Sequence, residues 1–237
     1  MILTAHQPTF LPWTGLLHKI ALAEKFIVFD AVQFEYHEYG NRCRILTDQG
    51  VQFVTVPVKT QGHTSKRFCD MEIADPKWAD KAVKTIRGSY AKTKFFKTYS
   101  PELFEIMRAH PADLATLNVE LMAFLLKSFG IERPTARASS FDFAGYKSGL
   151  VLDMCKTLGA ETYVFGAAGK DYADRQSFAD AGVKVKFQRF TPAAYDQGWG
   201  RLFTPGLSSL DLLFRYGPRS LEIVLQGNPT KVDELDD

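Results

Sequence analysis

Continuous apolar runs alternate with helical patterns at both ends of the chain. Such runs are typical of strands that are buried on both faces of a parallel sheet. A strand, a helix and a second strand within about 30 residues also predict parallel pairing. Strands are predicted at residues 2–5, 25–34, 161–166 and 183–190, with helices between them at residues 12–24 and 171–181.

The middle of the chain follows a different pattern. Residues 44–58 read as a hairpin that turns at 47–50, with alternating apolar positions after the turn. Further helices are predicted to start at Asp75-Pro76 and at Ser100-Pro101, to run over 114–129 up to Gly130, and to run over 147–158 up to Gly159.

Together these patterns predict the α/β class. We expect a Rossmann-like, mostly parallel sheet with a peripheral β-hairpin and a helical insertion at about 75–130. Residues 1–228 are expected to form a single domain, and 229–237 an acidic flexible tail.

The composition indicates the cellular compartment in which the protein is expected. The 237 residues are 46% hydrophobic and 24% charged, which is ordinary for a globular protein. No apolar run approaches the roughly 20 residues of a membrane span, and no basic-then-apolar leader opens the chain. The chain has three cysteines, Cys43, Cys69 and Cys155, which are far apart in the sequence. An odd number of widely spaced cysteines indicates reduced thiols and not a disulfide framework. We therefore expect a cytoplasmic protein without membrane insertion.

The net charge is only +2, but one segment of the chain is strongly basic. Residues 41–97 contain twelve Lys or Arg against five Asp or Glu, an excess of seven positive charges. This excess indicates either a solvated helix face or a surface that attracts a phosphorylated substrate or an acidic carrier. No nucleic-acid-binding motif accompanies it, so the expected partner is a small anionic substrate. The oligomeric state is left open.

The first candidate site follows the first strand. His6 and Gln7 stand at its end, and Pro8 favours an extended conformation for Gln7. The carboxyl ends of strands in open α/β sheets bind ligands. His6 is then an acid, a base or a phosphate contact, or else a structural His bonded to a nearby carbonyl. Phe10 and Trp13 are the expected apolar walls.

A second candidate follows the strand at 161–166. Gly166 and Gly169 enclose a turn that continues into Lys170, Asp171 and Tyr172. Glycines allow the backbone to approach a ligand, and a helix N-terminus favours an anion. The alternative is an ordinary glycine-rich turn in which Asp171 caps the following helix.

Two weaker candidates complete the predicted site. Arg42 can clamp a carboxylate or phosphate, or it can form a plain salt bridge. Ser208 and Asp211 resemble a capping box, although Asp replaces the usual Glu or Gln. Ser209 is then either part of a cap or a substrate contact.

Common cofactor and metal signatures are not found. The sequence has no Walker A motif, no Gly-x-Gly-x-x-Gly, no His-Glu-x-x-His and no Gly-x-Ser-x-Gly. Metal-ligand spacing is also lacking among the five histidines His6, His18, His37, His63 and His110, although His6 and His18 could meet in the fold. No metal is predicted, and the cofactor is unknown, with a nucleotide or sugar nucleotide as the class considered.

A combination of short motifs resembles the WbqC-like family. It spans residues 2–217 and comprises His6-Gln7-Pro8, Phe10-x-Pro12-Trp13-x-Gly15, Asp30-x-x-Gln33-Phe34, Asn41-Arg42, Gly169-Lys170-Asp171-Tyr172, Phe187-Gln188 and Leu207-Ser208-x-x-Asp211-Leu212. Members resemble enzymes encoded among bacterial O-antigen and other cell-surface glycan loci. The resemblance implies a cytoplasmic role in modifying a sugar nucleotide or a related metabolite.

A second likeness, at the level of fold, is to the nucleotidylyltransferase superfamily. Phe10-x-Pro12 with Gly15 resembles its first loop, and Ser208-Ser209 resembles its later serine motif. The turn at 165–172 is similar to one in pantothenate synthetases. Both motif histidines are missing, and only His6 or His18 could replace them. Function does not follow from a shared fold.

These observations lead to one function hypothesis and two alternatives. The leading hypothesis is a transferase of surface-polysaccharide biosynthesis that acts on a nucleotide-linked or phosphorylated metabolite. The alternatives are an ATP-using nucleotidylyltransferase or ligase, and a non-catalytic metabolite-binding subunit. The predicted catalytic residues are His6, Gln7 and Asp171, and the predicted substrate-binding residues are Phe10, Trp13, Arg42, Lys170, Tyr172 and Ser209.

Overall fold

The computed structural model describes residues 1–36, 38–109 and 112–237. Its central feature is a five-stranded sheet with the strand order β5-β2-β1-β6-β7, in which all neighbours are parallel. The strands are β1 (Ile2–His6), β2 (Lys25–Val28), β5 (Thr135–Arg137), β6 (Thr162–Phe165) and β7 (Lys184–Phe187). The predicted α/β class and the adjacency of the first strand and the strand near residue 163 are confirmed.

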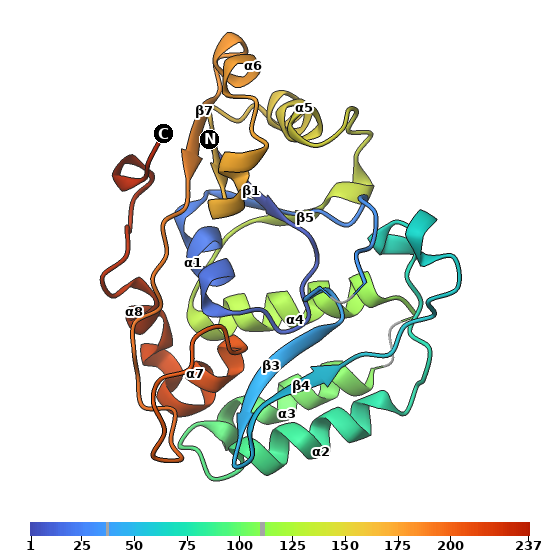
Figure 1. Ribbon diagram of the computed structural model, residues 1–237, viewed down its shortest axis with the longest axis vertical. Coiled ribbons are helices and arrows are strands. Elements are labelled where there is room, and N and C mark those ends of the chain that lie inside the picture. The colour runs from blue at the N-terminus through green and yellow to red at the C-terminus, as the bar shows by residue number, and fades with distance from the viewer. Residues whose placement is uncertain (37, 110–111) are drawn as a thin grey trace.

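Helices cover both faces of this sheet (Figure 1). Helix α1 (Thr14–Leu22) lies on one face, and α5 (Ser148–Leu158) and α6 (Arg175–Asp180) lie on the other. Alternate residues of β1 separate the two layers, because Leu3 and Ala5 pack with α5 and α6. His6, one residue after Ala5, therefore faces the opposite side, which α1 covers.

The segment between β2 and β5 forms the lower half of the molecule in Figure 1. An antiparallel hairpin, β3 (Arg42–Thr47) and β4 (Gly50–Thr55), packs there with three helices. The helices are α2 (Trp78–Tyr90), α3 (Phe96–Arg108) and α4 (Leu114–Phe129). Two later helices, α7 (Ser209–Tyr216) and α8 (Ser220–Leu225), join the same apolar core. The hairpin and the helical insertion are thus both present.

Short 3-10 helices connect these elements. They comprise His63–Ser65, Phe68–Asp70, Ala138–Ser140, Ala167–Asp171, Gly217–Arg219 and Val232–Glu234.

Several predicted boundaries were wrong. Strand β2 ends at Val28 and not at 34, because Asp30 turns out of the sheet and its backbone N–H bonds to the Val28 carbonyl. Helix α3 begins at Phe96, and Pro101 lies inside it. The buried ring of Phe96 packs on Phe104 and Phe214, which outweighs the local start signal of the proline.

Three more differences concern the ends of helices and one strand. Helix α2 begins at Trp78, since the Asp75 carboxylate accepts from Lys77 N–H in a turn before the helix. The cap of α6 is Asp174 and not Asp171, because Asp171 closes the 3-10 helix that precedes it. The short edge strand β5 was not predicted.

Residues 229–237, predicted as a flexible acidic tail, run along the α1 side of the sheet. Val232 and Leu235 are buried against Leu22 and Val164. The Asp236 carbonyl accepts from the Phe187 backbone N–H at 2.9 Å, which extends the edge of β7.

Candidate functional site

The strand order changes direction at β1. From this strand the chain proceeds to β2 and β5 on one side and later to β6 and β7 on the other. The carboxyl ends of β1 and β6 therefore flank the topological switch point, where open α/β sheets form their ligand crevice. His6 ends β1, and Gly166 follows β6. Two of the predicted site segments thus leave the sheet at neighbouring strands of one edge.

His6 is partly buried at this edge and held by its own loop. Its Nδ1 lies 2.9 Å from the Gln7 carbonyl oxygen, so Nδ1 carries the hydrogen and donates. The Nε2 atom of a neutral ring is then an acceptor, and it has no hydrogen-bond partner among the described residues. Burial, followed by the nearby charge of Lys19, lowers the pKa of His6 from 6.5 to about 3. With this pKa the ring is neutral at pH 7.

Lys19 is a functional candidate that the sequence interpretation missed. It lies on α1 with only 4% of its surface exposed, and its Nζ donates to the Ala5 carbonyl at 2.9 Å. Within the part of the chain that the structure describes, this ammonium forms no salt bridge. Burial lowers its pKa from 10.5 to about 7. The only sequence signal was a lysine within the apolar stripe of a helix.

The loop after β1 brings other predicted residues to this edge. The rings of His6 and Trp13 meet edge to face, with centroids 5.7 Å apart. Ser209 N–H, at the start of α7, donates to the Pro12 carbonyl at 2.8 Å. The Ser209 hydroxyl is fully buried and has no hydrogen-bond partner among the residues the structure describes. Phe10, in contrast, is fully buried in the core against Trp78.

Arg42 starts β3 in the hairpin, so it belongs to a separate sheet. Its guanidinium lies over the Phe53 ring at 4.6 Å. Two residues further, the Arg44 carbonyl accepts from Ser208 N–H at 2.7 Å. The start of the hairpin is thereby connected to the start of α7, and through Ser209 to the loop after β1.

The turn after β6 presents three exposed residues. Lys170 pairs with the Asp236 carboxylate at 3.1 Å. Tyr172 contacts the Phe165 ring, and Asp171 ends the 3-10 helix. A side chain at Gly169 would collide with Phe165, where a Cβ would stand 2.5 Å from the Phe165 Cβ. The glycine here permits the turn to pack on β6.

A buried ion pair lies beside the switch point, at the ends of β2 and β5. Asp30 is fully buried, and one of its oxygens accepts from Arg137 Nε at 2.6 Å. Ser139 donates to Asp30 through its N–H at 2.9 Å and through its hydroxyl at 2.8 Å. Arg137 Nη1 also donates to Thr116 on α4. This network fastens the edge of the sheet to the helical insertion.

His18 has a structural role on α1. Its Nε2 bonds to the Pro229 carbonyl at 2.8 Å, and its Nδ1 lies 2.8 Å from Gln188 Nε2. The residue that faces His6 from α1 is Lys19 and not His18. His37 and His110 lie outside the described residues. Among the described residues, no group of three or more His, Cys, Asp or Glu could hold a metal ion.

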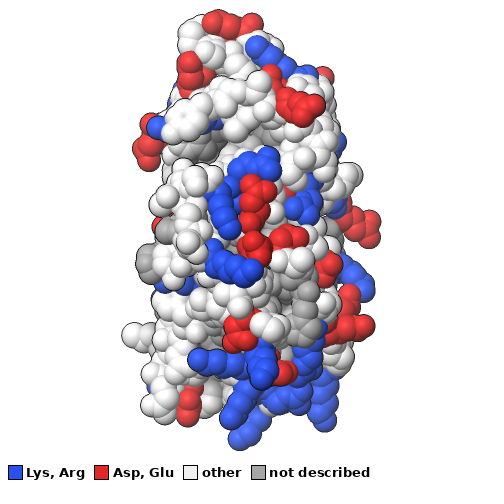
Figure 2. All heavy atoms as spheres, turned by 90° about the vertical axis from the view of Figure 1, so that its right-hand side faces the viewer, with Lys and Arg blue, Asp and Glu red and all other residues white. Residues whose placement is uncertain are grey.

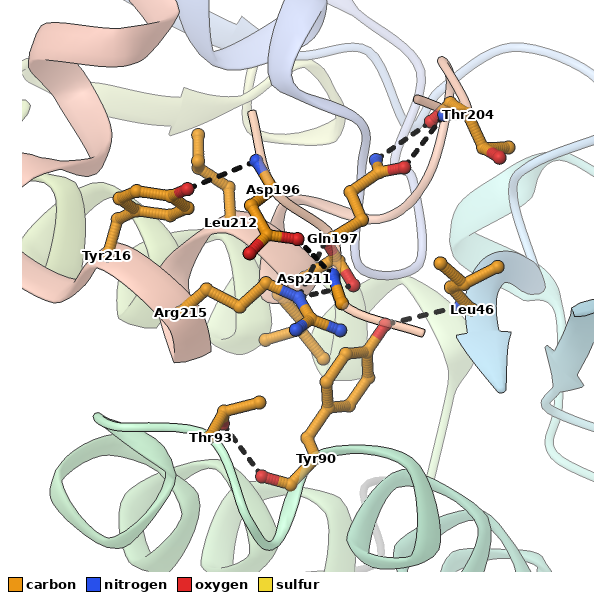
Figure 3. A network of polar contacts seen from close by, with 12 residues as sticks. Leu46, Tyr90, Thr93, Asp196, Gln197, Thr204, Asp211, Leu212, Arg215 and Tyr216 are labelled. Carbon is orange, nitrogen blue, oxygen red and sulfur yellow. Dashed lines mark hydrogen bonds and ion pairs between the residues drawn. The ribbon is translucent and has the colours of Figure 1, made fainter. Parts of the chain in front are cut away.

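Asp211 was expected to take part in a capping box, and this was wrong. Ser208 does cap α7, because its hydroxyl accepts from Leu210 N–H at 3.3 Å. Asp211 instead accepts from Arg215 Nε (Figure 3). It also accepts from the hydroxyls of Tyr90 and Tyr195. Burial raises the pKa of this carboxyl, and its three donors oppose that shift. The polar centre of this half of the molecule is therefore Asp211.

The basic segment predicted from the sequence has a visible counterpart. In Figure 2, Lys and Arg side chains gather at the lower end of the molecule, where Figure 1 shows α2 and α3. A cavity of about 550 Å³ opens beside the end of α2, away from His6 and Lys19. In the described ranges, no helix combines the length and the apolar character that are needed to cross a bilayer.

Two comparisons with known proteins cover most of the chain. A protein of Mycobacterium tuberculosis, the uncharacterized protein Rv1507c, is 29% identical over 213 residues, which cover 89% of this chain and 92% of that protein. The sequence model of the WbqC-like protein family matches residues 7–223. The chain therefore belongs to the WbqC-like protein family.

Proposed function

We propose that this protein is an enzyme that transfers a group to or from a nucleotide-linked or phosphorylated metabolite in the assembly of bacterial cell-surface polysaccharide. One observation supports the proposal that the protein is an enzyme. The buried amine of Lys19 stands beside His6 at the carboxyl end of the central strand. The polysaccharide context rests on the family resemblance alone.

The chemistry of these two groups suits proton transfer. A lysine with a pKa of about 7 is half neutral at pH 7, and the neutral amine accepts a proton from an attacking hydroxyl or amine. His6 Nε2 accepts a hydrogen bond from a second polar group of the acceptor molecule. A bond then forms between the acceptor and the transferred group, and the phosphorylated part leaves. Gln7 orients the substrate, while Arg42 and Lys170 neutralise charge on the leaving phosphate.

A thermal-shift panel tests this proposal, because a ligand of the folded state raises the melting temperature. We expect sugar nucleotides to raise the melting temperature of the wild-type protein. Lys19→Met and His6→Gln are expected to reduce that increment, each measured against its own unliganded melting temperature. Lys84→Met, at an exposed position of α2, is the matched control and keeps the increment.

The other outcomes separate the alternatives. Stabilisation by ATP with magnesium but not by sugar nucleotides supports a nucleotidylyltransferase or ligase. A sugar-nucleotide increment that keeps its full wild-type size in both Lys19→Met and His6→Gln rejects the strand-edge site. A ligand that binds but is never turned over by the wild-type protein supports a non-catalytic subunit.

A further inference from the structure

A cavity of about 550 Å³ lies between three segments that are distant in sequence. Its walls are the end of α2 with the following turn (Gly88 to Lys94), the loop at 196–199, and the end of α7 at Arg215 and Tyr216. A second hollow of about 440 Å³ adjoins it and shares Lys94, Arg215 and Tyr216. Volumes of this size are typical of sites for small metabolites. None of the strand-edge residues lines either hollow.

Arg215 is held rigidly at the floor of this cavity. Its Nε lies 3.3 Å from both oxygens of Asp211, and its side chain is only 14% exposed. Asp211 is in turn fixed by the hydroxyls of Tyr90 and Tyr195. Among the described residues, Nη1 and Nη2 of Arg215 have no hydrogen-bond partner. Two donors of a preorganised guanidinium thus remain for an anion.

The charge around Arg215 also favours an anion. Lys92 and Lys94 line the same cavity with exposed side chains, whereas its one acidic lining residue is Asp196. An oxygen of Asp196 is already occupied by the Gly198 N–H at 2.7 Å. The lining therefore carries three cations against one carboxylate. Positive walls around a hollow raise the local concentration of anionic ligands.

The loop at 198–200 adds an aromatic surface. Gly198, Trp199 and Gly200 all have left-handed backbone angles, with φ of 71°, 62° and 60°. This conformation is uncommon for a residue such as tryptophan and costs energy. The loop holds the Trp199 indole at the cavity with 47% of its surface exposed. A planar ring of a ligand can stack on such a face.

We propose that this cavity is a second ligand site, separate from the strand edge, that binds a nucleoside diphosphate. The diphosphate contacts Arg215, Lys92 and Lys94, and the base stacks on Trp199. Asp211, Tyr90 and Tyr195 are positioning residues that keep the guanidinium aimed into the cavity.

Isothermal titration with ADP and with inorganic pyrophosphate tests the site. Lys92→Gln combined with Lys94→Gln is expected to weaken binding of both probes at least tenfold. The matched control, Lys81→Gln with Lys84→Gln, removes the same charge from exposed positions of α2 and is expected to stay within twofold of wild type. Equal losses in the two double variants, or no binding of ADP to the wild-type protein, would overturn the proposal.

Two further variants separate stacking from charge and this site from the strand edge. Trp199→Ala is expected to weaken ADP several-fold and to leave pyrophosphate binding unchanged, and an equal effect on both probes contradicts the stacking contact. Lys19→Met is expected to bind both probes like wild type. If Lys19→Met abolishes ADP binding, the nucleotide occupies the strand edge and the second site is rejected.

Discussion

Burial of Lys19 makes this single residue oppose the stability of the fold. Its folded pKa of about 7 lies below its unfolded value of about 10.4, so folding disfavours the charged form. The resulting loss of stability is complete below pH 7 and disappears as pH rises toward 10.4.

We therefore predict that Lys19→Met stabilises the fold by about 1–3 kcal/mol at pH 6 while it abolishes activity. The gain should shrink steadily between pH 7 and pH 10, where the wild-type amine also becomes neutral in the unfolded chain. Urea unfolding of both proteins at pH 6, 8 and 10 measures this difference.

Lys84→Met is the control, because Lys84 is exposed on α2 and should change stability little at any of these pH values. A Lys19→Met protein that is less stable than wild type at pH 6 would show that the bond to the Ala5 carbonyl outweighs the cost of burying the ammonium.

Residue identity alone also misassigned several polar side chains. Asp171 and Asp174 are equally good caps in sequence, yet Asp174 accepts from Ser177 N–H and starts α6. Asp211 was read as part of a cap because Ser208 stands three residues before it. Its real partners, Tyr90, Tyr195 and Arg215, include two residues that are distant in sequence, and only the fold brings them near.

At the scale of elements, α4 is the helix whose bounds were predicted most closely. It begins at Leu114 and ends at Phe129, followed by Gly130 with a φ of 69°. Its apolar pattern and its terminal glycine predicted the same helix, and in the structure Asp113 caps its start. Agreement between pattern and end signals explains why this prediction succeeded.

Asp113→Ala is predicted to destabilise the protein by about 1–2 kcal/mol, because the carboxylate accepts from Thr116 N–H and from the Thr116 hydroxyl. The Thr116 hydroxyl also accepts a hydrogen bond from Arg137 Nη1. The substitution should therefore also weaken the network of hydrogen bonds around Asp30. Chemical denaturation of the variant measures the cost.

Asp174→Ala serves as the comparison. It removes the equivalent cap from α6, which has only six residues, and should cost less, about 0.5 kcal/mol. If the two variants lose the same stability, the cap of α4 has no special coupling to the sheet.

At the scale of the whole molecule, residues 229–237 connect parts that are far apart in sequence. Val232 and Leu235 cover Leu22 and Val164, and the Pro229 carbonyl accepts from His18. The two apolar side chains are almost completely buried.

Removal of residues 229–237 is accordingly predicted to lower the stability by about 3 kcal/mol or more, since two buried apolar side chains are lost and Leu22 and Val164 become exposed. Differential scanning calorimetry of the truncated chain checks this. Replacing Asp233 with Asn, at an exposed position of the same segment, is the control, and it should melt like wild type. An unchanged melting temperature for the truncated chain would mean that the segment adds nothing to the fold.

The sequence by itself determined the α/β class, the parallel pairing, the hairpin, α4 and the strand end that carries His6. These follow from local patterns, because apolar periodicity and turn residues act within one element. Only the tertiary structure decided where β2 turns, where α3 begins, and that Lys19 is buried beside His6. The cavity around Arg215 could not be predicted from the sequence either. The physical reason is that burial and electrostatic environment arise from segments that meet only when the chain is folded.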